Sequence, residues 1–180
     1  ANGGTNTSAA QTFKISVLAV NDPPSFTKGP DQEVLEDAGK QTVVTWATGM
    51  SAGPANESAQ TWTFTVTAGN KSLFAEQPAL SPDGTLTYTP VANSNGVTTV
   101  TVVMKDSGGT KAGTATAGRN TSDARTFTIT ITAVNDPPSF TKGADVTVLE
   151  DSGAKTVTKW ATNIKAGPAN ESAQQLSFTV

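Results

Sequence analysis

Polar and apolar residues alternate along several short stretches of the chain. In residues 61–67, Trp62, Phe64 and Val66 alternate with threonines, and residues 126–132 follow the same pattern. A period of two places apolar side chains on one face of a β-strand and polar ones on the other. Further strands are predicted at 32–35, 41–47, 73–75, 85–89 and 98–105. No stretch shows a helical period with caps, so the pattern predicts an all-β fold.

Turn signals separate these stretches. Pro82-Asp83-Gly84 precedes one predicted strand and Asn95-Gly96 another, and both combinations favour tight turns. Six or seven short strands in about 110 residues are typical of an antiparallel β-sandwich of immunoglobulin-like type. Because the chain has no cysteine, Trp46 and Trp62 are predicted to fill the core position of the usual disulfide. Trp160 is likewise expected in a core rather than on a sugar-stacking surface.

The pattern occurs more than once, at an offset of 114 residues. Residues 20–66 match residues 134–180 at 33 of 47 positions, and residues 1–19 match residues 115–133 at 10 of 19. We therefore expect tandem sandwiches: 1–20 as the C-terminal strand of a preceding repeat, 21–133 as one complete β-sandwich repeat, and 134–180 as the N-terminal part of the following repeat. A segment of a longer tandem array is the expected setting.

Composition narrows the classes of function. The 31 threonines suit half-exposed strands, and 16 glycines and 10 prolines supply turns. The absence of histidine and cysteine excludes a Ser-His-Asp triad and thiolate metal sites. Adjacent Glu36 and Asp37 are expected on opposite faces of a strand, which argues against a glycosidase pair. We predict no enzyme and no small-molecule substrate.

Charge and hydropathy bear on partners. The formal net charge of −3 is the wrong sign for a phosphate backbone, so no nucleic-acid partner is expected. The chain contains no run of 18 apolar residues, so no membrane span is predicted. Asn-x-Ser/Thr acceptor sequences for glycosylation occur at Asn6, Asn56, Asn70, Asn120 and Asn170.

Four motifs carry a resemblance that covers the whole chain. Val-Asn-Asp-Pro-Pro-Ser-Phe, Val-Leu-Glu-Asp, the segment 82–90 and Lys105-Asp106-Ser107-Gly108 resemble the bacterial cadherin-like tandem repeats of large secreted or surface-attached adhesins and matrix proteins. The resemblance implies a seven-strand sandwich, an extracellular or cell-surface location and a role in adhesion. It also implies that calcium binds at junctions between repeats and stiffens the rod.

The same resemblance nominates metal ligands. The ligands of the family's linker correspond to Asn21, Asp22, Asn135 and Asp136, and its early glutamate corresponds to Glu36, with Glu150 for a further junction. Asp106 matches an Asp-x-Gly ligand. Where cadherins carry an Asp-x-Asp pair, this chain has Asn56 with Glu57 and Asn170 with Glu171. The Asp-Arg-Glu motif is absent, which leaves a weaker site, fewer ions or none. Asn-Asp-Pro-Pro is also a stiff linker without metal, and these acids can be ordinary turn residues.

The sequence as a whole predicts a structural repeat of a long extracellular rod or fibre, such as an adhesin stalk or a surface or matrix filament. Its expected partners are neighbouring repeats of the same chain. Two alternatives stay open. One is a binding module that recognises a glycan or a surface protein through its end loops. The other is a self-assembling fibre subunit completed by neighbouring chains.

Overall fold

The computed structural model describes residues 3–110 and 118–180 of the chain, and their regular structure is almost entirely β. The strands are β1 (Ser25–Thr27), β2 (Gln32–Leu35), β3 (Gln41–Val43), β4 (Thr48–Ser51), β5 (Trp62–Ala68), β6 (Phe74–Leu80), β7 (Leu86–Pro90), β8 (Gly96–Asp106), β9 (Arg125–Thr132), β10 (Ser139–Thr141) and β11 (Thr162–Lys165). Three short 3₁₀ helices are η1 (Ala55–Glu57), η2 (Lys71–Leu73) and η3 (Ala169–Glu171). Within the described ranges, no helix is both long and apolar enough to span a membrane.

Beside the two-stranded pair β1–β4, residues 25–132 form two larger sheets. One has the strand order β2-β9-β8-β5 and the other the order β3-β7-β6. The predicted all-β class is confirmed, and the strands pair antiparallel with one exception. The exception is β2, which runs parallel to β9 with Val34 opposite Ile131. Both strands therefore end at the same edge of the sheet, which positions the residues that follow them.

The apolar residues of the alternating pattern form one hydrophobic core. Val100, Val102 and Met104 of β8 are fully buried, as is Leu86 of the other sheet. Intervening threonines such as Thr99 face solvent. Burial of apolar surface contributes about 25 cal/mol per Å², so this core supplies most of the stabilisation of the two sheets.

The tryptophans differ in their environments. Trp46 is only 2% exposed, as predicted, and its ring lies 4.4 Å from that of Phe127. Its indole N–H donates to the Pro30 carbonyl at 2.9 Å. Trp62 is half-buried at the edge of the core, and Trp160 is 38% exposed. The core expectation therefore holds for Trp46, only partly for Trp62, and not for Trp160.

Two strands differ from their predicted extents by more than two residues at one end. The strand predicted at 41–47 ends at Val43, because Thr45 adopts φ +52° and the chain turns there. The strand predicted at 73–75 continues to Leu80 through Pro78. Proline is tolerated on an edge strand, and β6 is the last strand of its sheet, with register shifts along its length.

The second copy of the sequence reproduces the local structure of the first but not its burial. The pair β10–β11 and helix η3 lie 114 residues after the pair β1–β4 and η1. Phe140 is 50% exposed, whereas the aligned Phe26 is 7% exposed. Each ring packs edge-to-face on another phenylalanine, Phe64 for Phe26 and Phe178 for Phe140. Phe26 also belongs to a core that residues of β5, β8 and β9 share, and residues 134–180 form no counterpart of these strands in the structure.

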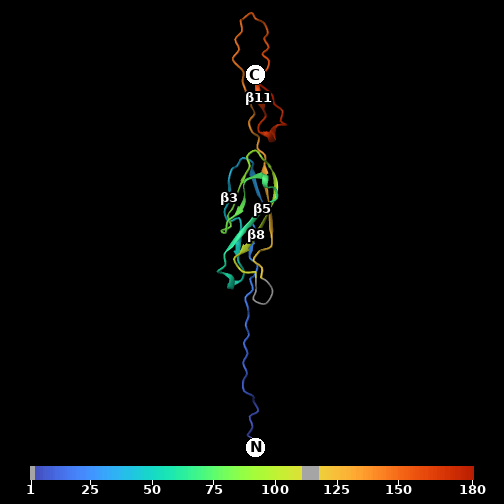
Figure 1. The fold of residues 1–180 in the computed structure, drawn as a ribbon. Coiled ribbons are helices and arrows are strands. Elements are labelled where there is room, and N and C mark those ends of the chain that lie inside the picture. The colour runs from blue at the N-terminus through green and yellow to red at the C-terminus, as the bar shows by residue number, and fades with distance from the viewer. Residues whose placement is uncertain (1–2, 111–117) are drawn as a thin grey trace.

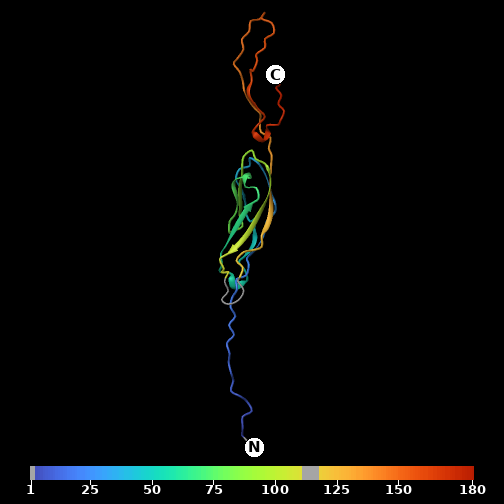
Figure 2. The same cartoon turned by 45° about the vertical axis from the view of Figure 1, so that its right-hand side comes forward.

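Residues 3–20 form no strand, although a terminal strand is predicted there. Phe13, Ile15 and Val17 keep the alternating pattern and are exposed. A single strand without a neighbour has no partner for its backbone groups and no core to cover. Figures 1 and 2 show this segment leaving one end of the β-rich body, with residues 134–180 continuing from the other end.

Candidate metal centre between the two copies

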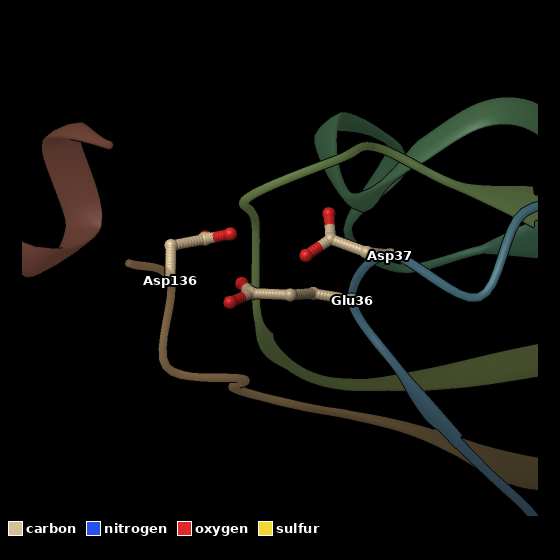
Figure 3. Close-up of side chains that lie close together, drawn as sticks. All are labelled: Glu36, Asp37 and Asp136. Carbon is tan, nitrogen blue, oxygen red and sulfur yellow. The ribbon is translucent and has the colours of Figure 1, made fainter. Parts of the chain in front are cut away.

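Three carboxylates converge where the first copy of the sequence meets the second. Glu36, Asp37 and Asp136 each place an oxygen within 4.8 Å of the others (Figure 3). The parallel pairing of β2 and β9 explains the approach, because Leu35 lies opposite Thr132 and both strands end there. The Glu36 N–H donates to the Thr132 carbonyl at 3.0 Å. The acids after β2 therefore meet the linker after β9.

Glu36 is the most buried of the three, with 1% of its surface exposed. Its Oε1 accepts hydrogen bonds from the Val134 N–H at 3.0 Å and from Asn170 Nδ2 at 3.2 Å, and its Oε2 lies 3.3 Å from the same Nδ2. A buried charge needs such partners. Glu36 consequently connects the first copy, the linker and the second copy.

Asp37 belongs to the cluster but was not nominated from the sequence. Strand β2 ends at Leu35, so Glu36 and Asp37 lie in a turn rather than on a strand. In a turn, two adjacent side chains can face the same side, and the expectation of opposite faces is wrong here. Asp37 Oδ1 also accepts the Asn93 N–H at 3.0 Å. The repeated Glu-Asp pair was the available sequence signal.

Asp136 and Glu171 have carboxylate oxygens without partners. The Asp136 N–H donates to Glu171 Oε1 at 2.9 Å, which holds a side chain only 5% exposed. Glu171 Oε2 and Asp136 Oδ2 are buried, and neither accepts a hydrogen bond from the residues the structure describes. Desolvation raises the pKa of the Asp136 carboxyl above its ordinary value, and the charges of Asp37, Glu171 and Glu36 raise it further.

Space around Glu171 depends on a glycine. A Cβ placed on Gly167 would collide with Glu171 Oε2 and would lie 3.4 Å from Asp136 Cβ. The same holds in the first copy, where a Cβ on Gly53 would collide with Glu57 Oε2. Both loops therefore require a residue without a side chain for the glutamate to reach the linker.

Asn135 and Asn170 lie at the rim of the carboxylate cluster. Asn135 Oδ1 accepts a hydrogen bond from Gln174 Nε2 at 3.0 Å, and its amide donates to the Asp136 carbonyl at 3.2 Å. A cavity of about 270 Å³ beside the cluster is lined by residues that include Asn95, Asn135, Asn170 and Glu171. Asn135 Oδ1 keeps a second lone pair with which it can also bind a cation.

The residues nominated around the first linker, Asn21-Asp22 (the first junction), form an arrangement related to that around Asn135-Asp136 (the second junction). Asn21 Nδ2 lies 3.2 and 3.3 Å from the two oxygens of Asp106, and Gln60 Nε2 donates to Asn21 Oδ1 at 2.8 Å. The Asp22 N–H donates to Glu57 Oε1 at 3.0 Å. Asp106 and Glu57 are both buried, and Glu57 Oε2 has no partner among the described residues.

Two nominated residues take no part in these clusters. Asn56 is exposed on η1, whereas the aligned Asn170 reaches Glu36. Glu150 is exposed in the turn that corresponds to Glu36-Asp37. The first junction also yields no group of three carboxylates comparable to Glu36, Asp37 and Asp136 in the described part of the chain.

The donor set fits a hard cation. Ca²⁺ binds six to eight oxygens, mostly of carboxylates and carbonyls. Three carboxylates converge between the two copies, and Glu171 lies next to Asp136. The ion pairs found among the described residues, Lys40–Glu76, Arg119–Asp123 and Lys142–Asp145, involve none of these acids. The unpartnered oxygens of Asp136 and Glu171 are the acceptors that such a cation would satisfy.

Comparison with known proteins identifies no family for this chain. No protein-family model matches the sequence, and no curated protein matches it.

Proposed function

We propose that the chain is a structural segment of a long extracellular rod or fibre, in which successive immunoglobulin-like β-sandwiches are joined by Asn-Asp-Pro-Pro linkers and stiffened by Ca²⁺. The observation that carries the proposal is the cluster of Glu36, Asp37 and Asp136, joined by buried Glu171. These residues come from the first copy, the linker and the second copy. A cation at this position holds three parts of the chain in one arrangement.

The repeat supports the proposal in two ways. Local structure recurs at an offset of 114 residues, with Asp22 bonded to Glu57 as Asp136 is bonded to Glu171. The two junctions also display different parts of one site, because Asp106 contacts Asn21 at the first and Glu36 contacts the linker at the second. A junction between two complete repeats would combine both sets of carboxylates.

Within this site, the residues have distinct roles. Glu36, Asp37, Asp136 and Glu171 supply carboxylate oxygens, and bound Ca²⁺ neutralises their mutual repulsion. Asn170 and the Val134 N–H hold Glu36 in place. The two prolines after Asp136 restrict the linker backbone, so the ion fixes an angle that the linker already limits.

The test is a calorimetric titration of the chain with Ca²⁺, compared with Asp136→Asn and the control Asp83→Asn. Asp83 lies in an exposed turn, bonded to Ser81 and Thr85. We expect saturable binding by the natural chain and by Asp83→Asn, and at least about tenfold weaker binding by Asp136→Asn, a loss of about 1.4 kcal/mol. An absence of heat and of any Ca²⁺-dependent rise in melting temperature would refute the calcium proposal.

Completion by a neighbouring chain is the second candidate. The exposed alternating residues Phe13, Ile15 and Val17 favour it, as do exposed Phe140 and Trp160 in the second copy. Sedimentation velocity over a range of concentrations separates the two. Concentration-dependent growth supports assembly between chains, and a single elongated species at all concentrations supports a rod built along one chain.

A further inference from the structure

The loop between β7 and β8 reaches the carboxylate cluster. Its Asn93 N–H donates to Asp37 Oδ1 at 3.0 Å. Asn95, two residues later, is exposed and lines the cavity that also contains Asn135, Asn170 and Glu171. A chemical change at Asn95 would therefore alter the charge or the backbone next to the carboxylate cluster.

We propose that Asn95 is a site of spontaneous deamidation, which adds a carboxylate to the junction as the protein ages. Asn95 is followed by Gly96, the first residue of β8, with φ +151°. Glycine has no Cβ to block approach to its backbone nitrogen. The Asn95 side chain makes no hydrogen bond within the part of the chain that the structure describes, so its amide is free to rotate toward Gly96.

The reaction needs only water. The Gly96 backbone nitrogen attacks Cγ of Asn95 and forms a C–N bond, the Cγ–Nδ2 bond breaks, and ammonia leaves with the proton from the Gly96 nitrogen. Water then opens the five-membered imide. Cleavage at Cγ yields aspartate, and cleavage at the backbone carbonyl yields isoaspartate, in which the chain runs through Cγ. Either product carries one more negative charge than asparagine.

The other asparagines at the junction differ from Asn95. Asn135 precedes Asp136 and Asn170 precedes Glu171, so each next residue carries a side chain. Both side chains are also held by hydrogen bonds, Asn135 by Gln174 and Asn170 by Glu36. Asn93 precedes Ser94 in the same loop and serves as an internal reference.

The consequence rests on the proposed calcium function. For an assumed separation of about 7 Å, a negative charge strengthens the binding of a doubly charged ion in water by roughly two- to sevenfold, depending on screening by salt. Isoaspartate also lengthens the backbone by one atom, which displaces the loop that donates from Asn93 to Asp37. Aspartate is therefore expected to tighten cation binding, and isoaspartate to weaken it relative to aspartate.

Peptide mass spectrometry of the whole chain, incubated at mildly alkaline pH, tests the reaction itself. We expect Asn95 to convert at least about tenfold faster than Asn93, a barrier difference of about 1.4 kcal/mol. Conversion of Asn95 no faster than Asn93 would overturn the proposal. This readout needs no calcium, so it stands or falls independently of the proposed function.

Calcium titration of Asn95→Asp against Asn95→Gln tests the consequence. We expect the dissociation constant of Asn95→Asp to be about two- to sevenfold lower. Equal constants, with calcium bound by both variants, would overturn the electrostatic effect of a carboxylate at residue 95. If no protein of the set binds calcium, including the natural chain, it is the proposed function that fails.

Discussion

Replacement of Trp46 by alanine is expected to destabilise the two-sheet body severely, whereas the same change at Trp160 is not. The two residues occupy aligned positions, but Trp46 is 2% exposed and packs against Phe127, and Trp160 is 38% exposed. Each indole N–H donates to a backbone carbonyl at 2.9 Å, that of Pro30 or Ala144. The pair therefore differs mainly in burial.

The size of the effect follows from that burial. A buried tryptophan removes up to about 250 Å² from water, which at about 25 cal/mol per Å² is about 6 kcal/mol of transfer free energy. Alanine retains part of it, and measured Trp→Ala losses in cores are about 3–5 kcal/mol. For a body of this size, about 4 kcal/mol corresponds to a fall in melting temperature of roughly 15 °C. Trp160→Ala is expected to change it by less than about 4 °C, or 1 kcal/mol.

Far-UV circular dichroism during heating measures both variants without depending on tryptophan emission. Trp46→Phe, which keeps an aromatic ring beside Phe127, is expected to lose only about 1–2 kcal/mol. If Trp46→Ala does not fold, Trp46→Phe still gives a melting temperature that can be compared with that of the natural chain. Equal shifts for Trp46→Ala and Trp160→Ala would refute the conclusion that residues 25–132 alone hold the formed core.

Three further predictions follow from local structure. Thr45→Gly is expected to raise the free energy of unfolding by about 1 kcal/mol, since a β-branched residue at φ +52° is strained. The control Thr42→Gly, in β3, is expected to lower it. If urea unfolding shows a lower free energy of unfolding for both variants, the prediction is contradicted. Gly167→Ala is expected to weaken calcium binding by moving Glu171, while Gly109→Ala, with open space around it, leaves titration curves unchanged. Because the pKa of Asp136 is raised in the folded chain, its ionised form destabilises the metal-free junction. In chelator, the free energy of unfolding should therefore rise as the pH falls through that pKa toward the ordinary value of 3.8. Asp136→Asn should abolish this slope, and an identical pH profile for the variant would contradict the assignment.

Strands with a strict period of two could be predicted closely from the sequence. The pattern of Trp62, Phe64 and Val66 identifies β5 because side chains alternate faces whatever the neighbouring strand is. The extent of β6 could not be predicted, because Pro78 normally breaks a strand and is tolerated only at the edge position that the tertiary fold creates.

The carboxylate cluster was predicted only in part, and for a physical reason. Glu36, Asp136 and Glu171 could be nominated from motifs, but their meeting depends on the parallel contact of β2 with β9, almost 100 residues apart. Asp37 was missed because the end of β2 at Leu35 decides whether two adjacent acids diverge or converge. Asn56 was nominated by the same motif as Asn170. In the described part of the chain Asn56 is exposed and bonds to no carboxylate, whereas Asn170 bonds to Glu36.

The most direct test of the calcium-stiffened junction is a distance measurement across it. The chain has no cysteine, so Thr99→Cys on β8 and Lys165→Cys on β11, both exposed, can carry a pair of spin labels for electron–electron double resonance. With millimolar Ca²⁺ we predict one narrow distance distribution, which broadens in excess chelator and no longer narrows with Ca²⁺ when Asp136 is replaced by asparagine. Identical distributions with Ca²⁺ and with chelator would contradict the account and leave the linker alone to set the angle.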